Sequence, residues 1–226
     1  MSGEALRKAR KQRGWTQAQA GARLGVSQAY VALLEKGRRP VPDDLARKAV
    51  REFKLSPVLL PAEEPSTVKA EKLARDLSRL GYPGFAYMRG GWLKNPGEVL
   101  LSAVAQPNLD SRLAEALPWL LLHYSDVDSD WLVRQARLLN LTNRLGFVVD
   151  LAKQVLERNS ETNSPRYWAL TRLSETLGAG RLAGEDTLGQ SLTETERNWF
   201  RANRPQEARF WNLLTNWQPE FLQFTL

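Results

Sequence analysis

The 226-residue chain contains no cysteine and a single histidine, His123. Disulfide bonds and thiolate metal sites are therefore excluded, and the usual zinc sites built from Cys and His have too few ligands. No apolar run approaches the roughly 18 residues of a membrane-spanning helix, and the basic start MSGEALRKARKQRG is followed by no apolar signal-peptide segment. We therefore predict a cytoplasmic protein with no metal site and no membrane contact.

Three aspartates, Asp126, Asp128 and Asp130, have the spacing of the first ligands in a calcium-binding loop. Trp131 stands where such a loop requires glycine, and Arg137 stands where it requires the final glutamate. We therefore interpret these aspartates as the N-terminal cap of the helix that begins near Trp131.

Enzyme motifs are also missing from the sequence. The glycines of segment 178–180 follow no predicted strand, so they do not form a dinucleotide-binding turn, and no Walker-type phosphate loop is present. Ser66 and Lys69 have the S-x-x-K spacing of a Ser-Lys dyad, but the chain after them has a helical pattern rather than a β-rich one. We predict no catalytic residue and no cofactor, and hence a protein that is not an enzyme.

The positive charge is concentrated at the N-terminal end of the chain. Residues 1–55 carry 13 Lys and Arg against 5 Asp and Glu, a net +8, whereas the remaining residues carry 19 against 20, a net −1. Because the whole excess lies in one segment, that segment is expected to bind a polyanion.

The stretch TQAQAGARLGVSQAYVALLEKG, residues 16–37, predicts two short helices joined by a tight turn. Thr16 and Ser27 are each suited to cap a helix start, and Gly25 between them is suited to the left-handed conformation that ends the first helix. The pattern predicts a helix-turn-helix. Short helices with a glycine hinge also occur in many all-helical domains, so the hinge alone leaves DNA binding open.

In the second of these helices, Val31 and Leu34 have the spacing of a buried stripe. The opposite face is the candidate reading surface and carries Gln28, Ala29, Ala32 and Leu33. An amide such as Gln28 can bond an adenine edge through a donor and an acceptor at once, and small apolar groups can contact thymine methyls.

Further helices are predicted on both sides of this pair, at residues 4–13 and 45–53, with one more short turn through Leu60. Trp15 precedes the capping Thr16, where it is expected to pack back onto the following helix as a hydrophobic staple. The segment Lys36 to Pro40 between the helices is a basic loop.

Residues 4–60 thus resemble the helix-turn-helix domain of the phage-repressor (Cro/XRE) family. The resemblance covers about a quarter of the chain and rests on Arg10, Gly14, Trp15 to Gln17, Leu24 to Ser27, Val31 and Leu34 to Pro40. It implies a five-helix, lambda-repressor-like domain that binds double-stranded DNA. By that analogy, Gln28 and Ala29 enter the major groove, and Gln17 touches a phosphate or supports Gln28. The full expected set of DNA-binding residues is Thr16, Gln17, Ser27, Gln28, Ala29, Tyr30, Ala32, Leu33, Lys36, Arg38 and Arg39.

The resemblance also implies that Arg10 and Glu35 form a structural ion pair that orients the reading helix. The alternative is that both are solvated surface residues. One departure from the family lies at Ala20 and Gly21, where the family often has Leu-Ala. The core is expected to be thinner there, and the glycine is expected to cost the helix roughly 1 kcal/mol.

Three prolines in segment 57–65 predict a domain boundary, because neither a helix nor a central strand accepts them. We predict a helix-turn-helix domain at 1–60, a linker at 61–66 and an all-helical dimerisation or partner-binding domain at 67–226, and hence an all-α fold. Ser66 is expected to cap a helix at 67–80, and residues 81–98 form an irregular loop. Further helices are predicted at 96–105, 110–123, 128–140, 142–158, 165–178, 193–203 and 206–217.

Seven of the eight tryptophans lie beyond the linker. We interpret them mainly as core anchors, with Trp92 and Tyr87 in the irregular loop as exceptions that mark a partner or ligand surface. The terminal segment 211–226, which ends in FLQFTL, is either a docking segment or the last packed helix.

Two functions from different classes fit these observations. The first is a sequence-specific transcriptional regulator, a repressor that binds a pseudo-palindromic operator as a homodimer. The second is an antitoxin, whose helical domain binds a toxin protein and whose N-terminal domain represses its own operon. A small-molecule sensor with a pocket among the tryptophans is a third possibility.

Overall fold

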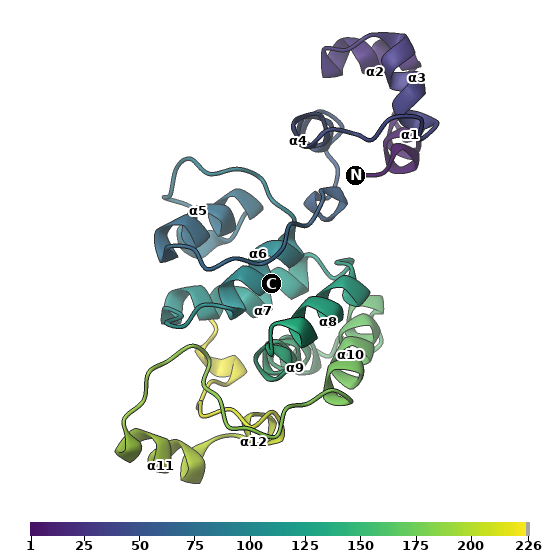
Figure 1. Cartoon of the computed structure of the whole chain (residues 1–226). Helices are drawn as coiled ribbons and strands as arrows, with labels where there is room; N and C mark the ends of the chain where they lie inside the picture. Colours follow the sequence, from purple (N-terminus) through teal and green to yellow (C-terminus); the bar gives the residue numbers. More distant parts are fainter. Residues whose placement is uncertain (225–226) are drawn as a thin grey trace. The chain divides into compact units, whose positions relative to one another are not determined.

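The structure, a computed structural model, describes residues 1–224 and divides the chain into two compact units (Figure 1). The N-terminal unit comprises Met1–Ala62 together with Leu93–Asn95, and the C-terminal unit comprises Glu63–Trp92 and the chain from Pro96 onward. Within residues 1–224 the regular structure is helical, apart from one isolated bridge between Asp186 and Leu213. The prediction of an all-α fold is confirmed.

The N-terminal unit contains four α-helices and one 3-10 turn. The elements are α1 (Gly3–Gln12), α2 (Gln17–Leu24), α3 (Gln28–Glu35), α4 (Asp43–Glu52) and η1 (Pro57–Leu59). The fifth helix expected from the sequence is thus a single 3-10 turn. It begins at a proline, whose missing N–H is no loss at a helix start.

Each boundary in the helix-turn-helix has a local cause. Thr16 Oγ1 accepts from Gln19 N at 3.2 Å, while Gln19 Oε1 accepts from Thr16 N at 2.8 Å, which closes a capping box at the start of α2. Gly25 ends α2 with φ 73°, in the left-handed region. Ser27 then caps α3 by accepting from Tyr30 N at 3.2 Å.

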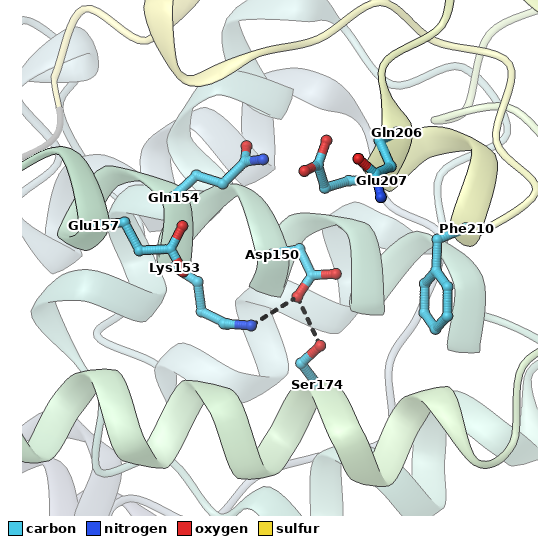
Figure 2. A pocket seen from close by; sticks show the side chains of 8 residues that line it. All are labelled: Asp150, Lys153, Gln154, Glu157, Ser174, Gln206, Glu207 and Phe210. Carbon is cyan, nitrogen blue, oxygen red and sulfur yellow. Dashed lines mark hydrogen bonds and ion pairs between the residues drawn. The ribbon is translucent and has the colours of Figure 1, made fainter. Parts of the chain in front are cut away.

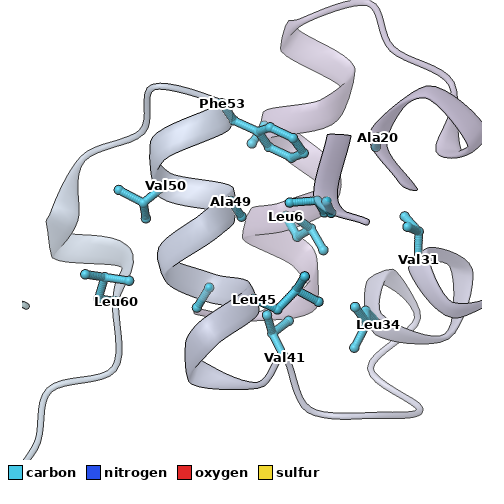
Figure 3. Packing of buried hydrophobic residues seen from close by; sticks show 13 residues of the cluster. Leu6, Ala20, Val31, Leu34, Val41, Leu45, Ala49, Val50, Phe53 and Leu60 are labelled. Atoms are coloured by element: carbon cyan, nitrogen blue, oxygen red, sulfur yellow. The ribbon is translucent and has the colours of Figure 1, made fainter. Parts of the chain in front are cut away.

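A single apolar cluster holds the four helices together (Figure 3). Leu6 of α1, Val31 and Leu34 of α3, and Ala49 of α4 are each at most 1 % exposed, as is Phe53 at the end of α4. Trp15 packs its ring edge-to-face on Phe53, with the ring centroids 4.9 Å apart. Trp15 was expected to staple onto the following helix, but its ring packs on the end of α4, and its contact with α2 is the Arg23 guanidinium, 4.1 Å from the ring centre.

Residues Leu93–Asn95 belong to the N-terminal unit although they are distant from it in sequence. Leu93 packs against the apolar cluster, and Asn95 Nδ2 donates to the carbonyl oxygens of Val58 at 2.9 Å and Leu60 at 2.8 Å. Asn95 therefore satisfies two carbonyls of the η1 turn. Nothing in the local sequence pattern indicated this return of the chain.

The C-terminal unit is a set of helices arranged around α9 (Thr142–Arg158), which contacts most of the other helices of the unit. Helices α9 and α10 lie side by side in Figure 1 and share the largest helix–helix contact of the chain. The other elements are α5 (Ala70–Leu80), η2 (Pro83–Phe85), α6 (Pro96–Val104), α7 (Ser111–His123), α8 (Ser129–Leu138), α10 (Pro165–Gly178), α11 (Glu194–Asn203), α12 (Gln206–Phe210) and η3 (Pro219–Phe221).

Two predicted helices of this unit differ from the structure. Helix α5 starts at Ala70 rather than residue 67, because Ser66 does not cap it; the Ser66 backbone N–H instead donates to Ser102 Oγ at 3.4 Å. Helix α12 ends at Phe210 rather than residue 217, because Asn212 adopts φ 53° and the chain then pairs Leu213 with Asp186. The predicted aspartate cap is confirmed, since Asp128 Oδ1 accepts from Trp131 N at 2.9 Å.

The tryptophans of the C-terminal unit are less uniform than predicted. Trp119 and Trp211 are buried, but Trp168 and Trp199 are more than half exposed, so the core interpretation is wrong for these two. Tyr87 and Trp92 are 61 % and 73 % exposed, as the sequence indicated for that loop.

The terminal segment 211–226 is not a long helix. Its described part, residues 211–224, has the bridge at Leu213 and the η3 turn as regular structure, Leu222 is buried, and the Phe224 ring packs edge-to-face on Tyr82 at 5.6 Å. The described part of this segment therefore packs within its own unit. Its last two residues, 225 and 226, lie outside the described residues. Within residues 1–224, no helix is both long and apolar enough to cross a membrane.

Candidate nucleic-acid interface

Helix α3 presents an accessible face opposite its buried stripe. Val31 and Leu34 are fully buried, whereas Gln28 and Ala29 in the first turn are exposed. Ala32 and Leu33, which belong to the expected reading set, are half-buried. The accessible part of the face is therefore concentrated at the start of the helix, around Gln28.

The basic loop is fixed to the end of α3 by backbone hydrogen bonds. Gly37 adopts φ 69°, its N–H donates to Leu34 O at 3.0 Å, and the N–H of Arg38 donates to Leu33 O at 3.0 Å. This Schellman-type ending places Lys36, Arg38 and Arg39 at the exposed C-terminal end of the helix. Positive side chains also interact favourably with the negative end of the helix dipole there.

Tyr30 and Arg39 connect the helix face with this basic loop. The Arg39 guanidinium lies 5.9 Å from the centre of the Tyr30 ring, in the range of a weak cation–π contact. Tyr30 is half-buried and Arg39 is exposed. The cation at the end of α3 is therefore held over the same helix that carries Gln28.

Thr16 and Gln17 lie at the start of α2. The Thr16 hydroxyl is exposed, and the backbone bond that it accepts leaves its own proton available. Gln17 Nε2 donates to Glu35 Oε2 at 3.0 Å. Gln17 therefore supports Glu35, at the end of α3 opposite Gln28, and its contact with a phosphate or with Gln28 stays a prediction.

Arg10 and Glu35 form a bidentate ion pair across the unit. Arg10 Nε lies 2.6 Å from Glu35 Oε1 and Arg10 Nη2 lies 2.9 Å from Oε2, and the two side chains are 11 % and 2 % exposed. Arg10 Nη1 also donates to Trp15 O at 2.7 Å. One guanidinium thus joins α1 to the end of α3 and to the turn before α2, which excludes the solvated alternative.

The electrostatics of the pair follow from this geometry. Burial by itself raises the pKa of Glu35, but the hydrogen bonds from Arg10 and Gln17 outweigh burial and hold that pKa below its ordinary value. The hydrogen bond to Glu35 in turn raises the pKa of Arg10. Both groups are therefore charged at neutral pH.

Two glycines mark places where the backbones come close. A Cβ on Gly3 would lie 1.9 Å from the carbonyl oxygen of Leu34, and a Cβ on Gly21 would lie 2.6 Å from that of Val26. The helix that carries the reading face is therefore seated directly on the first turn of α1. Gly21, which appeared from the sequence only to weaken α2, gives the turn room to pack.

Two groups of basic residues in the unit have different surroundings. Arg10 is paired with Glu35, and Arg13 Nη2 donates to Phe53 O at 2.6 Å, so both hold the fold together. Lys36, Arg38 and Arg39 are exposed beside α3. This second group lies beside the expected reading helix and is therefore positioned to meet a polyanion that contacts α3.

A separate cavity of about 380 Å³ lies within the C-terminal unit (Figure 2). Asp150 is at its centre and is held by Ser174 Oγ at 2.6 Å and by Trp211 Nε1 at 2.6 Å, with Lys153 Nζ at 3.7 Å. The remaining lining residues are Gln154, Glu157, Gln206, Glu207 and Phe210. The lining is mostly polar, so this cavity is not the pocket among tryptophans that the sensor hypothesis required.

Within residues 1–224, no group of three or more His, Asp or Glu side chains is arranged to hold a metal ion. Residues 6–60 match the family described as Helix-turn-helix. No curated protein and no solved structure matches the chain.

Proposed function

Because residues 6–60 form a helix-turn-helix domain of the Cro/XRE family of DNA-binding transcriptional regulators, we propose that the protein is a sequence-specific repressor acting in the cytoplasm. The observation that carries this proposal is the single exposed face of α3, with Gln28 and Ala29 at its start and three cations at its end. A helix of this kind fits the major groove with its N-terminal residues against the base edges.

In the proposed mechanism, different residues supply affinity and sequence preference. Lys36, Arg38 and Arg39, with Tyr30, hold the DNA backbone, and Thr16 adds a hydroxyl contact to a phosphate. Gln28 reads a base edge through its amide, and Ala29 contacts a methyl group in the groove. Arg10 and Glu35 touch no DNA but fix the orientation of α3.

We further propose that the protein binds DNA as a homodimer. A single helix-turn-helix module buries only roughly 600–1,000 Å² on DNA, which limits its affinity. Two copies with recognition helices about 34 Å apart match a pseudo-palindromic operator. The C-terminal unit is the part of the chain available to supply the dimer contact.

An antitoxin is the second candidate function. It is favoured by apolar side chains that the C-terminal unit leaves exposed, among them Leu138, Trp168, Trp199, Phe210 and Phe221. A protein partner that covers them would be a toxin bound by this unit. Purification from the native host discriminates the two functions: a stoichiometric protein partner supports the antitoxin, and a bare homodimer bound to its own promoter supports the repressor.

The role of α3 is tested by measuring affinity for a selected duplex and for a random duplex at several salt concentrations. Gln28→Ala is expected to cost about 1–3 kcal/mol on the selected duplex and little on the random one. The double variant Arg38→Ala/Arg39→Ala is expected to reduce the affinity for both duplexes alike. It should also make the slope of log K against log[salt] shallower by about two.

The matched control removes two exposed lysines of α1, Lys8→Ala/Lys11→Ala, and changes the same net charge away from α3. It is expected to reduce affinity less than the arginine pair does. If the control and the arginine pair behave alike, or if Gln28→Ala weakens both duplexes equally, the assignment of roles on α3 is wrong.

A further inference from the structure

Helix α5 of the C-terminal unit has one apolar face and one basic face. Leu73, Leu77 and Leu80 are buried, whereas three basic side chains are exposed at spacings of three and four residues, namely Lys72, Arg75 and Arg79. These spacings place the three cations along one side of the helix. The repressor function proposed for the N-terminal unit does not use this face.

The loop after α5 lies along the same face and extends it. Ser78 Oγ donates to Met88 O at 3.3 Å, which ties the loop to the helix. A Cβ on Gly91 would lie 3.3 Å from Arg75 Cβ and 3.4 Å from Arg79 Cγ, so the loop backbone runs against the stems of these arginines. We call residues 72–92 of helix and loop the α5–loop surface.

A hollow of about 270 Å³ lies between the end of α5 and this loop. Arg79 comes to it from the helix and Arg89 from the loop, and Ser78, Met88 and Gly90 are among the other lining residues. Arg89 Nη1 donates to Ala86 O at 3.2 Å, which holds this side chain beside the loop. The other N–H groups of the two arginines are donors of the kind that bind a phosphate group.

The charge of the α5–loop surface is unbalanced. Between residues 72 and 92 the chain carries four basic side chains, all exposed, and one acid, Asp76, which is only 4 % exposed. Glu71 just before this segment forms an ion pair with Arg75. By contrast, residues 96–226 carry 16 acidic and 13 basic side chains. The cations are therefore gathered here within a unit that is otherwise slightly acidic.

Two aromatic rings are exposed among these cations. Tyr87 and Trp92 are 61 % and 73 % exposed, and the Arg112 guanidinium lies 6.0 Å from the Tyr87 ring centre. Exposed rings of this size offer flat faces on which a base can stack. Exposed cations together with exposed aromatic rings are the combination by which proteins bind single-stranded nucleic acid, because phosphates meet the cations and bases stack on the rings.

We propose that the α5–loop surface binds single-stranded nucleic acid, with Lys72, Arg79 and Arg89 on the phosphates and Tyr87 and Trp92 stacked on bases. Duplex DNA fits less well, because its bases are already stacked inside the helix and present no open base face to the two rings. An acidic protein segment would neutralise the cations but offers few flat faces for both rings. The site lies in the C-terminal unit and does not depend on the function proposed for α3.

The proposal is tested with the full chain and a fluorescein-labelled dT20 strand, by anisotropy across a salt series. All variants are made in an Arg38→Ala/Arg39→Ala background, which weakens the duplex surface of the N-terminal unit. In this background Arg79→Ala/Arg89→Ala is expected to weaken dT20 binding at least tenfold. The slope of log K against log[salt] is expected to become shallower by about 1.4, or about 0.7 for each lost phosphate contact. The control Arg134→Ala/Arg172→Ala removes two exposed arginines of α8 and α10 and is expected to change affinity less than twofold.

The stacking role has a separate readout. Trp92→Ala is expected to weaken dT20 binding by roughly 5- to 100-fold with little change in the salt slope, because a neutral ring releases no counterions. Trp199→Ala removes another exposed tryptophan of the same unit and serves as the control. Circular dichroism of each variant checks that the helices are retained.

Three results would overturn the proposal. The first is an equal loss of dT20 affinity in Arg79→Ala/Arg89→Ala and in its control. The second is an unchanged dT20 affinity in Trp92→Ala. The third is a loss of affinity in these variants for a 20-bp duplex but not for dT20. The last result would assign the surface to duplex phosphates. Failure of the Gln28 and Arg38/Arg39 experiments on duplex DNA would instead contradict the repressor function, so the two proposals fail separately.

Discussion

Each of the two units contains a bidentate arginine–carboxylate pair that joins distant segments, and these two pairs are buried to different extents. In the N-terminal unit, Arg10 and Glu35 are almost completely enclosed. In the C-terminal unit, Arg144 contacts both oxygens of Asp186 at 2.6 and 2.8 Å, but Asp186 remains 36 % exposed. Both pairs join distant segments, so in each unit these charges belong to the fold, and the candidate ligand surfaces are found among the exposed cations outside them.

The units also differ in their tryptophans. Trp15 of the N-terminal unit lies between Phe53 and Arg23, whose guanidinium is 4.1 Å from the Trp15 ring. The C-terminal unit combines a fully buried Trp211 with an exposed Trp199. A tryptophan therefore supports the core in one place and offers a surface in another, and only the packing around it decides which.

The largest expected effect separates these two kinds of tryptophan. Trp211 is 0 % exposed, its ring occupies the space beside Gly146, and its Nε1 donates to Asp150 at 2.6 Å. Trp211→Ala is expected to destabilise the C-terminal unit by about 3–5 kcal/mol. Trp199→Ala is expected to change stability by less than about 0.5 kcal/mol. Urea unfolding of both variants measures the difference, and similar midpoints would contradict the burial contrast.

The next effect compares the two ion pairs. Glu35→Gln keeps the shape of the side chain but removes the charge that Arg10 faces, and it is expected to cost the N-terminal unit roughly 2–3 kcal/mol. Asp186→Asn is expected to cost only about 1 kcal/mol, because solvent screens the exposed carboxylate. Native-state hydrogen exchange of peptides from α1–α3 and from α9 reports each unit separately. An equal loss in both units would remove the distinction between the pairs.

Asn95 tests whether the returning segment supports the N-terminal unit. Asn95→Ala leaves the carbonyls of Val58 and Leu60 without this donor and is expected to cost about 1–2 kcal/mol. The loss should appear as faster hydrogen exchange in α4 and η1. The exposed Asn108 offers a control, Asn108→Ala, for which no change is expected. Unchanged exchange in α4 would show that the segment contributes nothing to this unit.

The smallest expected effect is a loss of stability of the N-terminal unit at acid pH. The pKa of Glu35 in the folded protein lies below the ordinary value of 4.5, so its stabilising contribution is complete above that value and is lost as the pH falls through it and through the lower folded pKa. Stability of the N-terminal unit is therefore expected to decrease below about pH 4.5. The decrease should be smaller in Glu35→Gln, as unfolding followed from pH 6 to pH 3 will show. Parallel curves for the two proteins would contradict this role of Glu35.

The N-terminal unit was largely predictable because its determinants are local. Caps at Thr16 and Ser27, a left-handed glycine at Gly25 and the Val31/Leu34 stripe each act within a few residues. Helix boundaries in the C-terminal unit were predictable for the same reason wherever a side chain caps the helix, as Asp128 does for α8.

What could not be predicted depends on contacts between distant residues. The return of Asn95 to Val58 and Leu60, the pairing of Asp186 with Leu213 that ends α12, and the exposure of Trp168 and Trp199 have no signature in the local pattern. The α5–loop surface was indicated only in part. Its exposed aromatics stood out in an irregular loop, but the alignment of Arg79 with Arg89 became visible only in the fold.

The central claim is that the exposed start of α3 selects DNA sequence. Selection of bound fragments from a random duplex pool with the full protein tests it most directly. The account predicts a recovered motif of two related half-sites about one helical turn apart, and loss of preference at specific positions of each half-site in the Gln28→Ala variant. Recovery of fragments no different from the starting pool, or of the same motif with unchanged preferences from the variant, would contradict it.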